Sequence, residues 1–493
     1  MKRYLAALLA AVMLLGTLAG CSESKTAPEE TSGQNTGGTP VDPSVPAVEE
    51  ETETDILDYL GTPDWQGMEF NVVGRGSGSG EWEMFELNAE EENGEPLNDA
   101  VLQRNLLLED KYNLKIVGIK SDTYLNDFRT SVLSDTADFA AALLPADQAA
   151  GSATEGLFYN FNALPGVDLS NIWFDQNSRD TLSVGNKLFY CYGDMNLQNL
   201  DLTWCVMFNK QLALNHQIGD LYSLVDKNEW TIDKLFELSS DATIDLNGDG
   251  AYDERDQWGM ITPYDRTSFA IMYGAGVEFV SKNAEGIPEY KPLDDRAFTV
   301  FSKILTFYHK SKNCQNINAL GRAWREAEEM FMNNQGMFYV ECMQNLARFR
   351  EMEMDFGVLP MPKYDADQKE YRHMVCNFPA AFIIPSNCRD LDLAGFVTEA
   401  LNASSHTTVR AAYVDKCLQY KYSRDVESTG MIGLILSTMY YDPTYIYGWG
   451  NLVNSIGLLV SKNYDMLASQ EKSLQSRLVK DIETAVKAYE KLD

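Results

Sequence analysis

The chain is poor in the residues and patterns that most hydrolytic enzymes use. It has only four histidines among 493 residues, and it contains neither an HExxH zinc pattern nor a GxSxG nucleophile pattern. Its 73 acidic residues always permit some pair of carboxylates, so their number is no evidence for the two-carboxylate chemistry of glycoside hydrolysis. A catalytic role is therefore the weaker expectation, and a binding role the stronger.

Cysteine pairs at metal-binding or redox spacing are also missing. Apart from Cys21 near the N-terminus, the cysteines are widely scattered and none forms a CxxC pair: Cys191, Cys205, Cys314, Cys342, Cys376, Cys388 and Cys417. This distribution does not indicate a disulfide framework or a zinc site, and we expect buried free thiols.

Basic residues are few, 40 against 73 acidic ones, which gives a formal net charge of −33. A surface with this charge repels nucleic acid and anionic membranes, so neither is an expected binding partner. Beyond the N-terminal segment, no stretch reaches the roughly 18 consecutive apolar residues of a membrane span.

The N-terminal segment is the one strongly apolar part of the chain. Lys2 and Arg3 precede an apolar run over residues 4–18, which ends in the sequence LAGC at Cys21. A basic start, a short apolar run and small residues before a cysteine are typical of a secretory signal, here residues 1–20. The LAGC ending resembles the bacterial lipoprotein signal, which implies a lipid on Cys21 and anchoring outside the cytoplasm. The alternative is an ordinary signal peptide that leaves a soluble protein.

Residues 21–64 are rich in Ser, Thr, Gly, Pro and Glu and have almost no large apolar residues before Ile56. Such a composition cannot bury enough surface to fold, so we predict a disordered tether. The roughly 430 residues that follow exceed what one hydrophobic core usually holds, which favours two lobes.

The first part of the folded region alternates strands with helices. Strands are expected over 68–74, 114–119 and 139–144, and helices over 97–112 and 124–134. This alternation is typical of a parallel α/β sheet. The glycine-rich turn after the first strand lacks the dinucleotide fingerprint, because Ser79 stands where the last glycine is required. A loop at the carboxyl end of a strand is nevertheless where open α/β sheets bind ligands.

The remaining elements are expected in the same way. Between 182 and 214, two strands flank a polar stretch with Asp194, Asn196 and Asn199, which we interpret as the chain passing between lobes. The later expectations are helices over 323–333, 391–401 and 452–492 and strands over 336–341, 356–362 and 376–385.

An acidic loop follows a short predicted helix that begins after the capping residue Thr231. Side-chain oxygens at alternating positions, a glycine at position 6 (Gly250) and a backbone carbonyl at position 7 match a twelve-residue calcium loop. The predicted ligands are Asp245, Asn247, Asp249, Ala251, Asp253 and Asp256. Position 12 is Asp256 rather than the longer Glu, and no second helix follows. A structural calcium ion is expected, and the alternative is a surface turn without an ion.

These features together resemble the extracellular solute-binding proteins of ABC importers, in the branch with maltose- and oligosaccharide-binding lipoproteins. The resemblance covers residues 18–25 and roughly 65–490. It rests on LAGC, GNKLFY followed by VMFNKQL, LYSLVDKNEWTIDKLFEL, DLNGDGAYDERDQWGM, GMFYVE, FGVLPMPKYDADQKEY and PAAFIIPSN, in this order.

The resemblance implies a two-lobed α/β fold of the periplasmic-binding-protein type II, hinged by crossover segments. Each lobe would hold a mostly parallel sheet flanked by helices. The N-terminal lobe would comprise residues 65–195 plus 380–425, and the C-terminal lobe 200–375 plus 430–493. A monomer of this kind closes on a solute and delivers it to a membrane permease without covalent chemistry.

Candidate ligand-binding residues are the aromatic and polar residues of the expected interlobe segments, because sugars stack on aromatic rings and bond to carboxylates and amides. They are Arg75, Trp82, Asp194, Asn196, Trp204, Glu341, Asn377, Tyr441, Tyr445, Tyr447 and Trp449. Four of these candidates lie among turn residues in the Tyr-rich loop YYDPTYIYGWG. Of the expected interlobe segments, this loop has the composition most typical of a ligand-binding loop. Core packing is the alternative for each residue, and an ion pair with Arg350 is the alternative for Glu341.

The sequence therefore predicts a binding lipoprotein for a carbohydrate or oligosaccharide. A glycan-active hydrolase and a non-transport surface glycan-binding or sensor lipoprotein are the alternatives. A peptide or another polar nutrient is also compatible with these residues.

Overall fold

The computed structural model describes residues 55–262, 264–316, 324–349, 352–414 and 426–492. The predicted signal peptide, Cys21 and most of the predicted tether lie outside the described residues. The chain from Thr54 to Asp493 forms one compact unit, which contains two larger sheets and two hydrophobic cores.

The first sheet has the strand order β12-β3-β1-β2. Its strands are β1 (Met68–Arg75), β2 (Leu114–Ser121), β3 (Ala141–Pro145) and β12 (Ala380–Ile383). β1 runs parallel to both β2 and β3, whereas β12 pairs antiparallel with β3. The strands predicted in the first part of the folded region are thus confirmed, and a segment far along the chain completes their sheet.

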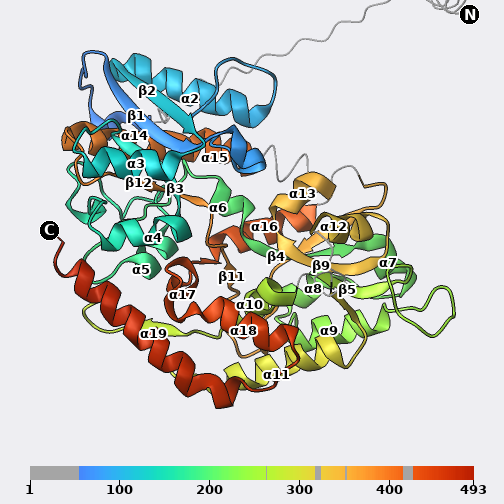
Figure 1. The fold of residues 1–493 in the computed structure, drawn as a ribbon. Helices are drawn as coiled ribbons and strands as arrows, with labels where there is room; N and C mark the ends of the chain where they lie inside the picture. Colours follow the sequence, from blue (N-terminus) through green and yellow to red (C-terminus); the bar gives the residue numbers. More distant parts are fainter. Residues whose placement is uncertain (1–54, 263, 317–323, 350–351, 415–425, 493) are drawn as a thin grey trace, which may run out of the picture. The chain divides into compact units, whose positions relative to one another are not determined.

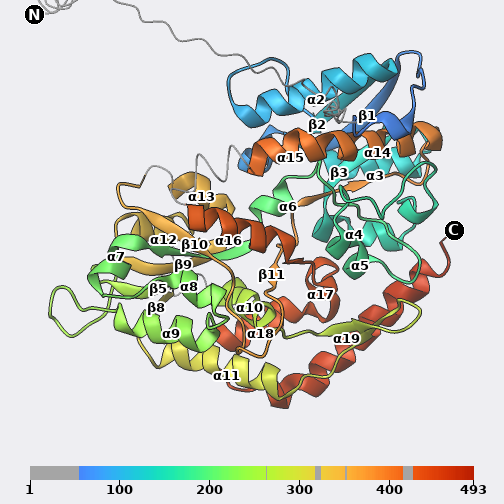
Figure 2. The same cartoon turned by 180° about the vertical axis from the view of Figure 1, so that it is seen from behind.

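Apolar residues on both faces of the central strands account for the burial of this sheet. Phe70, Val72 and Val73 of β1 are fully buried, and every residue of β3 is buried. The covering helices are α2 (Pro96–Tyr112), α3 (Tyr124–Leu133) and α14 (Leu391–Thr407) (Figures 1 and 2). Because both faces are covered, the strands are near-continuous apolar runs, as is typical of parallel sheets.

The second sheet has the strand order β10-β4-β9-β5-β8 and is mixed. Its strands are β4 (Trp204–Asn209), β5 (Trp258–Thr262), β8 (Cys314–Asn316), β9 (Gly336–Cys342) and β10 (Phe356–Leu359). β5 is parallel to β8 and β9, but β4 is antiparallel to both of its neighbours. Four of the five strands thus run in the same direction, and the sheet is mixed because the antiparallel β4 is inserted between β10 and β9.

Longer helices surround the second sheet and extend along the chain's last part. They are α9 (Ile232–Asp241), α10 (Tyr264–Gly274), α11 (Asp295–His309), α12 (Trp324–Met332), α16 (Val426–Ser437), α18 (Leu452–Ser461) and α19 (Leu467–Tyr489). The hydroxyl oxygen of Thr231 accepts a hydrogen bond from the Lys234 N–H at 3.3 Å, which confirms the predicted cap of α9.

Short elements connect these layers. The helices are α4 (Ala146–Thr154), α5 (Gln176–Leu182), α6 (Gln198–Asp201), α7 (Lys210–Asn215), α8 (Leu221–Asp226), α13 (Gln344–Phe349), α15 (Val409–Ala411) and α17 (Pro443–Ile446). The 3-10 helices are η1 (Asp58–Leu60), η2 (Ser77–Trp82), η3 (Phe161–Ala163) and η6 (Trp449–Asn451). The two small sheets pair β6 (Val280–Lys282) with β7 (Pro288–Tyr290) and β11 (His373–Met374) with β13 (Met439–Tyr440).

Helix α19 contributes to both cores. Leu478 and Ile482 belong to the core around the second sheet, whereas Tyr489 belongs to the core around the first. The Tyr489 ring lies edge-on to Phe189 at a centroid distance of 4.9 Å. This long C-terminal helix is dark red in Figure 1.

Two expectations from the sequence need correction. Residues 55–64, predicted to belong to the tether, pack on the folded unit. Leu57 is 1% exposed, and the Tyr59 hydroxyl donates to the Glu399 carboxylate at 2.9 Å. The physical reason is that residues 55–64, unlike the rest of the predicted tether, contain large apolar and aromatic side chains. The first strand expected after residue 182 is instead a loop with isolated bridges, such as Cys191 with Phe382.

Candidate functional site

A cavity of about 380 Å³ lies where elements next to the first sheet meet elements of the second. It is lined by Glu81, Trp82, Leu202, Arg266, Arg325, Glu328, Glu341, Cys342, Gln344, Arg348, Cys376 and Phe378. These residues come from η2, α10, α12, β9, α13 and the segments that precede β4 and β12. Its size falls within the range of about 300–1,000 Å³ that is usual for small-molecule sites.

One edge of the cavity is aromatic. Trp82 and Phe378 meet edge to face, with ring centroids 4.8 Å apart and an interplanar angle of 88°. The glycine-rich turn after β1 positions Trp82, and a Cβ at Gly76 would lie 2.5 Å from the Asp122 carboxylate. The turn therefore needs glycine for a close approach, and it places an aromatic ring at the carboxyl end of a parallel strand.

An ion-pair network spans the cavity wall. Arg348 on α13 contacts the carboxylate of Glu81 at 2.5 Å, and its other terminal nitrogen contacts Glu328 on α12. Burial raises the pKa of Glu328, and the positive charge of Arg348 partly offsets that shift. Because Glu81 belongs to η2, Arg348 joins the two groups of elements that enclose the cavity.

Glu341 is the most unusual polar group in the lining. It is fully buried, and its Oε1 accepts a hydrogen bond from the Cys342 N–H at 2.9 Å. Its Oε2 has no hydrogen-bond partner in the described part of the chain. Burial raises the pKa of Glu341 to about 7, although hydrogen bonds from Cys342 and the positive charge of Arg266 favour the ionised form. A buried oxygen without a partner beside a cavity is available to a bound molecule.

Two thiols lie side by side in the lining. The sulfur atoms of Cys342 and Cys376 are 3.5 Å apart, and the indole N–H of Trp204 donates to the Cys376 sulfur at 3.2 Å. The six cysteines within the described ranges have free thiols. Trp204 is itself fully buried and does not line the cavity, so it acts there only through its hydrogen bond to Cys376.

Of the residues predicted to bind ligand, Trp82 and Glu341 line this cavity. Asn377 lies between the lining residues Cys376 and Phe378 and is half-buried. The suggested ion pair between Glu341 and Arg350 involves a residue outside the described ones.

Three predicted polar residues have structural partners instead. The Arg75 guanidinium donates to the Gln198 side chain at 3.1 Å and to the Phe378 carbonyl at 2.8 Å. Asp194 pairs with Arg410 at 2.7 Å and with His406, and burial raises its pKa against the effect of these partners. Asn196 accepts from the Gly193 N–H and donates to the Ala380 carbonyl.

The Tyr-rich loop is packed into the interior. Tyr441 is fully buried, and its hydroxyl donates to Asp175 at 3.1 Å. Trp449 is 5% exposed and stacks on Tyr447, whose hydroxyl donates to the Leu182 carbonyl at 2.6 Å. Tyr445 is 4% exposed, and its hydroxyl has no partner within the described ranges. None of the four lines the cavity, so their place favours core packing, and ligand contact stays a prediction.

Apart from Glu341, the charged residues of the lining were missed from sequence. Arg325 and Glu328 are three positions apart and therefore share one face of α12, a spacing that reads as an ordinary solvated helix face. Arg348 lies on α13, the short helix that follows β9, so the only available signal was its place in the segment after the carboxyl end of a strand.

The backbone of the acidic loop folds tightly, and its carboxylates face the loop's own amide groups. Asp245 accepts from the N–H groups of Gly248 and Gly250 at 2.7 and 2.8 Å. Asp256 is fully buried and accepts from the N–H groups of Leu246 and Asp253 at 3.0 and 2.8 Å. A bridge between Ile244 and Gln257 closes the loop.

Arg255 forms ion pairs with two carboxylates of the acidic loop. Its guanidinium contacts the carboxylates of Asp253 at 2.5 Å and Asp249 at 3.2 Å. Within the described ranges, no group of three or more His, Cys, Asp or Glu side chains is arranged to hold a metal ion. The donors are the oxygen ligands that calcium prefers, so the residues fit the ion in kind, and binding requires Arg255 to release two of them.

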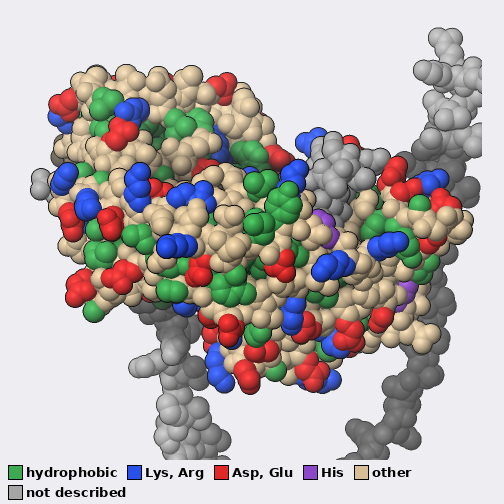
Figure 3. Space-filling view, turned by 60° about the horizontal axis from the view of Figure 1, so that its bottom comes forward, with side chains coloured by type: hydrophobic (Ala, Val, Ile, Leu, Met, Phe, Trp, Pro, Cys, Tyr) green, Lys and Arg blue, Asp and Glu red, His purple; other side chains and the backbone are tan. Residues whose placement is uncertain are grey.

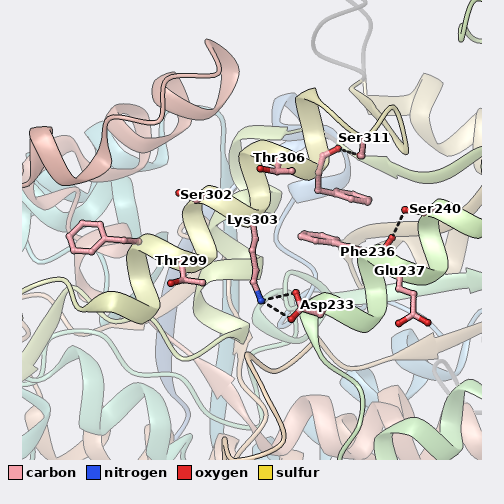
Figure 4. A pocket seen from close by; sticks show the side chains of 11 residues that line it. Asp233, Phe236, Glu237, Ser240, Thr299, Ser302, Lys303, Thr306 and Ser311 are labelled. Carbon is pink, nitrogen blue, oxygen red and sulfur yellow. Dashed lines mark hydrogen bonds and ion pairs between the residues drawn. The ribbon is translucent and has the colours of Figure 1, made fainter.

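A larger hollow of about 750 Å³ lies between α9 and α11 (Figure 4). Lys303 is bound to the Asp233 carboxylate at 2.6 Å, and the Phe236 ring stacks on Phe307 at 3.9 Å. Its lining comes only from α9, α11 and Ser311, so it does not lie between elements of the two sheets. Lys303 and Asp233 already pair with each other, and so do the two phenylalanine rings. The smaller cavity around Glu341 is therefore the better candidate site.

No protein-family model matches the chain, and no curated protein matches it. Solved structures do match, and they show the fold: the chain has the two-lobed α/β fold of ABC substrate-binding proteins that bind sugars. The expected resemblance to the maltose- and oligosaccharide-binding branch is thus confirmed at the level of fold.

Three neighbours illustrate the match. UspC of M. tuberculosis is 14% identical with a TM-score of 0.57, and 84% of this chain covers 100% of it. The GacH receptor of Streptomyces glaucescens, solved unliganded and with acarbose, is 12% identical with a TM-score of 0.51, over 87% and 100% of the two chains. An ABC substrate-binding protein of Listeria monocytogenes, solved with cycloalternan, is 12% identical with a TM-score of 0.51, over 86% and 99%.

Proposed function

We propose that this chain is an extracytoplasmic binding lipoprotein that captures a carbohydrate in the cavity around Glu341 and delivers it to an ABC permease. The observation that carries the proposal is the lining itself. Two aromatic rings, a buried carboxyl with an unpartnered oxygen and several guanidinium groups converge on a space of about 380 Å³. Aromatic faces and convergent polar groups are what sugar recognition requires.

The fold supports the same function. Neighbours with this fold were solved with acarbose and with cycloalternan, both of which are carbohydrate ligands. Elements on either side of the cavity are joined by the ion pair between Arg348 and Glu81, which suits a hinge that closes on a solute.

A binding screen tests the proposal. The chain from residue 22 is melted in the presence of neutral and acidic oligosaccharides, peptides and other small solutes. A ligand that binds only the native state must raise the melting temperature by mass action. We expect a shift from one class of sugar, and Trp82→Ala should remove it. Shifts from peptides alone would contradict the carbohydrate assignment.

Recovery of the bound molecule separates binding from hydrolysis. The lining holds three glutamates, and two of them have raised pKa values, so a catalytic pair is the alternative that the cavity allows. For a binding protein, the ligand released by denaturation has an unchanged mass after prolonged incubation. A shortened ligand would assign a hydrolase instead.

Membrane attachment through Cys21 is part of the proposal. No helix of the described ranges is both long and apolar enough to cross a bilayer. A lipid on Cys21 would anchor the protein through residues that precede the folded unit. The full-length protein should partition into detergent, and Cys21→Ala should move it to the aqueous phase. Stimulation of permease ATPase activity by the loaded protein would test delivery.

We also propose that the acidic loop binds a structural calcium ion. Calcium should raise the melting temperature and a chelator should lower it, because ion bound only by the native state stabilises that state by about 2.7 kcal/mol at 100 times its dissociation constant. Asp245→Asn should abolish the difference, whereas Asp367→Asn, which removes the same charge from another loop, should keep it. Identical melts with calcium and with chelator would contradict the proposal.

A further inference from the structure

The 3-10 helix η2 (Ser77–Trp82) forms a strap from the first sheet to elements of the second. It follows β1 closely, and the N–H of Gly76 just before it donates to the carbonyl of Ser121, the last residue of β2, at 2.9 Å. The last residue of the strap, Trp82, packs against the core around the second sheet. The strap is thus attached to the first sheet at its start and to the second core at its end.

An ion pair joins the strap to α13 directly before Trp82. The Glu81 carboxylate accepts from one terminal nitrogen of Arg348 at 2.5 Å. The other terminal nitrogen of Arg348 contacts Glu328 on α12 and donates to the Asn345 side chain at 3.1 Å. Two partners on the side of the second sheet therefore hold the guanidinium in place, and its remaining terminal nitrogen binds the strap.

The backbone of the strap does not by itself fix the position of the Trp82 ring. Residues 76–80 alternate glycine with serine, and Gly80 has a φ of 58° and a ψ of −125°, so the strap is kinked directly before Glu81. Glycine adopts many backbone conformations at little steric cost, and no residue from 77 to 82 is fully buried. A strap of this composition requires side-chain contacts to keep the ring in one place.

We propose that Glu81 and Arg348 are positioning residues whose ion pair holds the Trp82 ring against a bound sugar and thereby sets the lifetime of the complex. Trp82 lines the cavity and meets Phe378 edge to face, so a sugar that packs on this ring depends on the place of the strap. Release of the sugar requires the strap to move away, and such contacts act chiefly on the dissociation rate. The inference rests on the proposed carbohydrate binding and adds to it the residues that retain the sugar.

The test compares two substitutions in the same loop. Glu81→Gln removes the ion pair with Arg348 and leaves the buried Glu328 with its partner, whereas Arg348→Gln would remove both contacts. The matched control is Glu83→Gln, which removes the same charge two residues further on. Glu83 pairs with Lys120 on β2 at 2.9 Å, so that ion pair stays within the elements of the first sheet.

Surface plasmon resonance of the chain from residue 22 measures the rates, with glucose, galactose and mannose oligomers of one to three units as probes. For a sugar that the parent protein binds, Glu81→Gln should raise the dissociation rate by up to about fivefold, as expected for one partly exposed ion pair. The association rate should change by less than about twofold. Glu83→Gln should behave like the parent.

Salt separates the ion pair from a general effect of the substitution. Raising sodium chloride to about 1 M shortens the screening length to about 3 Å. The dissociation rate of the parent should then approach that of Glu81→Gln, whereas the rate of the variant should stay the same.

Hydrogen exchange gives a readout that does not depend on the choice of sugar. The amides of η2 should exchange faster in Glu81→Gln than in the parent, because a contact that opposes local opening is lost. Equal exchange, equal dissociation rates in Glu81→Gln and Glu83→Gln, or association and dissociation rates that rise by the same factor overturn the positioning role and leave the carbohydrate function standing. A folded parent protein that binds none of the probes overturns both.

Discussion

The ring of Trp449 lies nearly flat against that of Tyr447, with centroids 4.8 Å apart and 25° between the planes. The neighbouring Gly450 N–H donates to Asp481 on α19 at 2.8 Å, so the loop is attached to the long C-terminal helix. A residue that is 5% exposed and held in this way contributes to the packing of the interior.

Trp449→Ala should therefore lower the free energy of unfolding by about 3–5 kcal/mol, which is typical of removing a large buried aromatic side chain. Denaturant unfolding measures this loss. The matched control is Tyr464→Ala, because Tyr464 is 50% exposed and its removal leaves no buried cavity. Solute affinity of the folded Trp449→Ala variant should stay unchanged. A large loss of affinity with normal stability would restore the binding role suggested by the loop's composition.

His373 is a buried histidine with both ring nitrogens in use. Its Nε2 accepts from the Met361 N–H at 3.0 Å, and its Nδ1 lies 2.8 Å from the Thr438 hydroxyl, which itself donates to the Leu434 carbonyl. The Thr438 oxygen is thus free to accept, and the ring is held neutral with its proton on Nδ1. Burial lowers the pKa of His373 to about 3.

This histidine should make the protein sensitive to acid. The unfolded chain takes up a proton near pH 6.5, whereas the folded chain does so only near pH 3, so stability is lost as pH falls through this interval. The loss amounts to roughly 2 kcal/mol by pH 5. Buried acids such as Glu341 act with the opposite sign between about pH 4.5 and 7, so the measurement compares variants.

His373→Gln should show a smaller loss of unfolding free energy between pH 7 and 5 than the unmodified protein. Urea unfolding at the two pH values provides the comparison, with His309→Gln as the control on the second core. An equal loss in the His373 variant and the parent would show that His373 does not titrate differently on folding.

At the scale of single elements, glycine decides how closely α14 approaches its neighbours. A Cβ at Gly395 would lie 1.7 Å from the Pro165 carbonyl oxygen, a distance that no side chain can occupy without moving the helix. By contrast, Gly430 in α16 has nothing within 4 Å of such a Cβ. Close packing therefore requires glycine at position 395, whereas the space around Gly430 would admit a side chain.

Gly395→Ala should destabilise the protein by roughly 3 kcal/mol, because either α14 or the segment at Pro165 must shift. Gly430→Ala should stabilise it by about 0.5–1 kcal/mol, because alanine loses less backbone freedom in a helix. Thermal unfolding of both variants measures the difference. Equal effects of the two substitutions would mean that the close contact at Gly395 is not present in solution.

Over the whole molecule, acidic side chains outnumber basic ones. Figure 3 shows Asp and Glu interspersed with Lys and Arg over one face, and many of the acidic groups lie along the lower edge of the view. A formal net charge of −33 produces self-repulsion that weakens the compact state at low ionic strength.

The melting temperature at pH 7 should therefore rise when sodium chloride is increased from 10 to about 150 mM, where the screening length falls to about 8 Å. Sucrose at the same osmolality controls for effects other than screening. A melting temperature that does not change, or one that falls, would show that local ion pairs such as Lys303 with Asp233 offset the repulsion.

The sequence alone predicted most of the regular elements, because their causes are local. Periodic apolar residues marked α2, and a capping threonine marked the start of α9. Continuous apolar runs marked β3 and β9. The α/β class followed from the alternation of these elements along the chain. The antiparallel insertion of β4 had no local cause, since it depends on which strands come to lie beside it.

The candidate site shows what only the tertiary structure decided. Trp82 and Glu341 were predicted because they fall in expected interlobe segments, Trp82 in the loop after the first strand and Glu341 at the end of a strand. Arg325 and Arg348 were missed because a charged residue on a helix has the same local pattern whether it faces water or a cavity. The aromatic residues of the Tyr-rich loop were predicted to bind ligand, yet the fold buries Tyr441 in the first core and Tyr445 and Trp449 in the second. Burial and the lining of a cavity depend on contacts between residues hundreds of positions apart, and no local pattern contains that information.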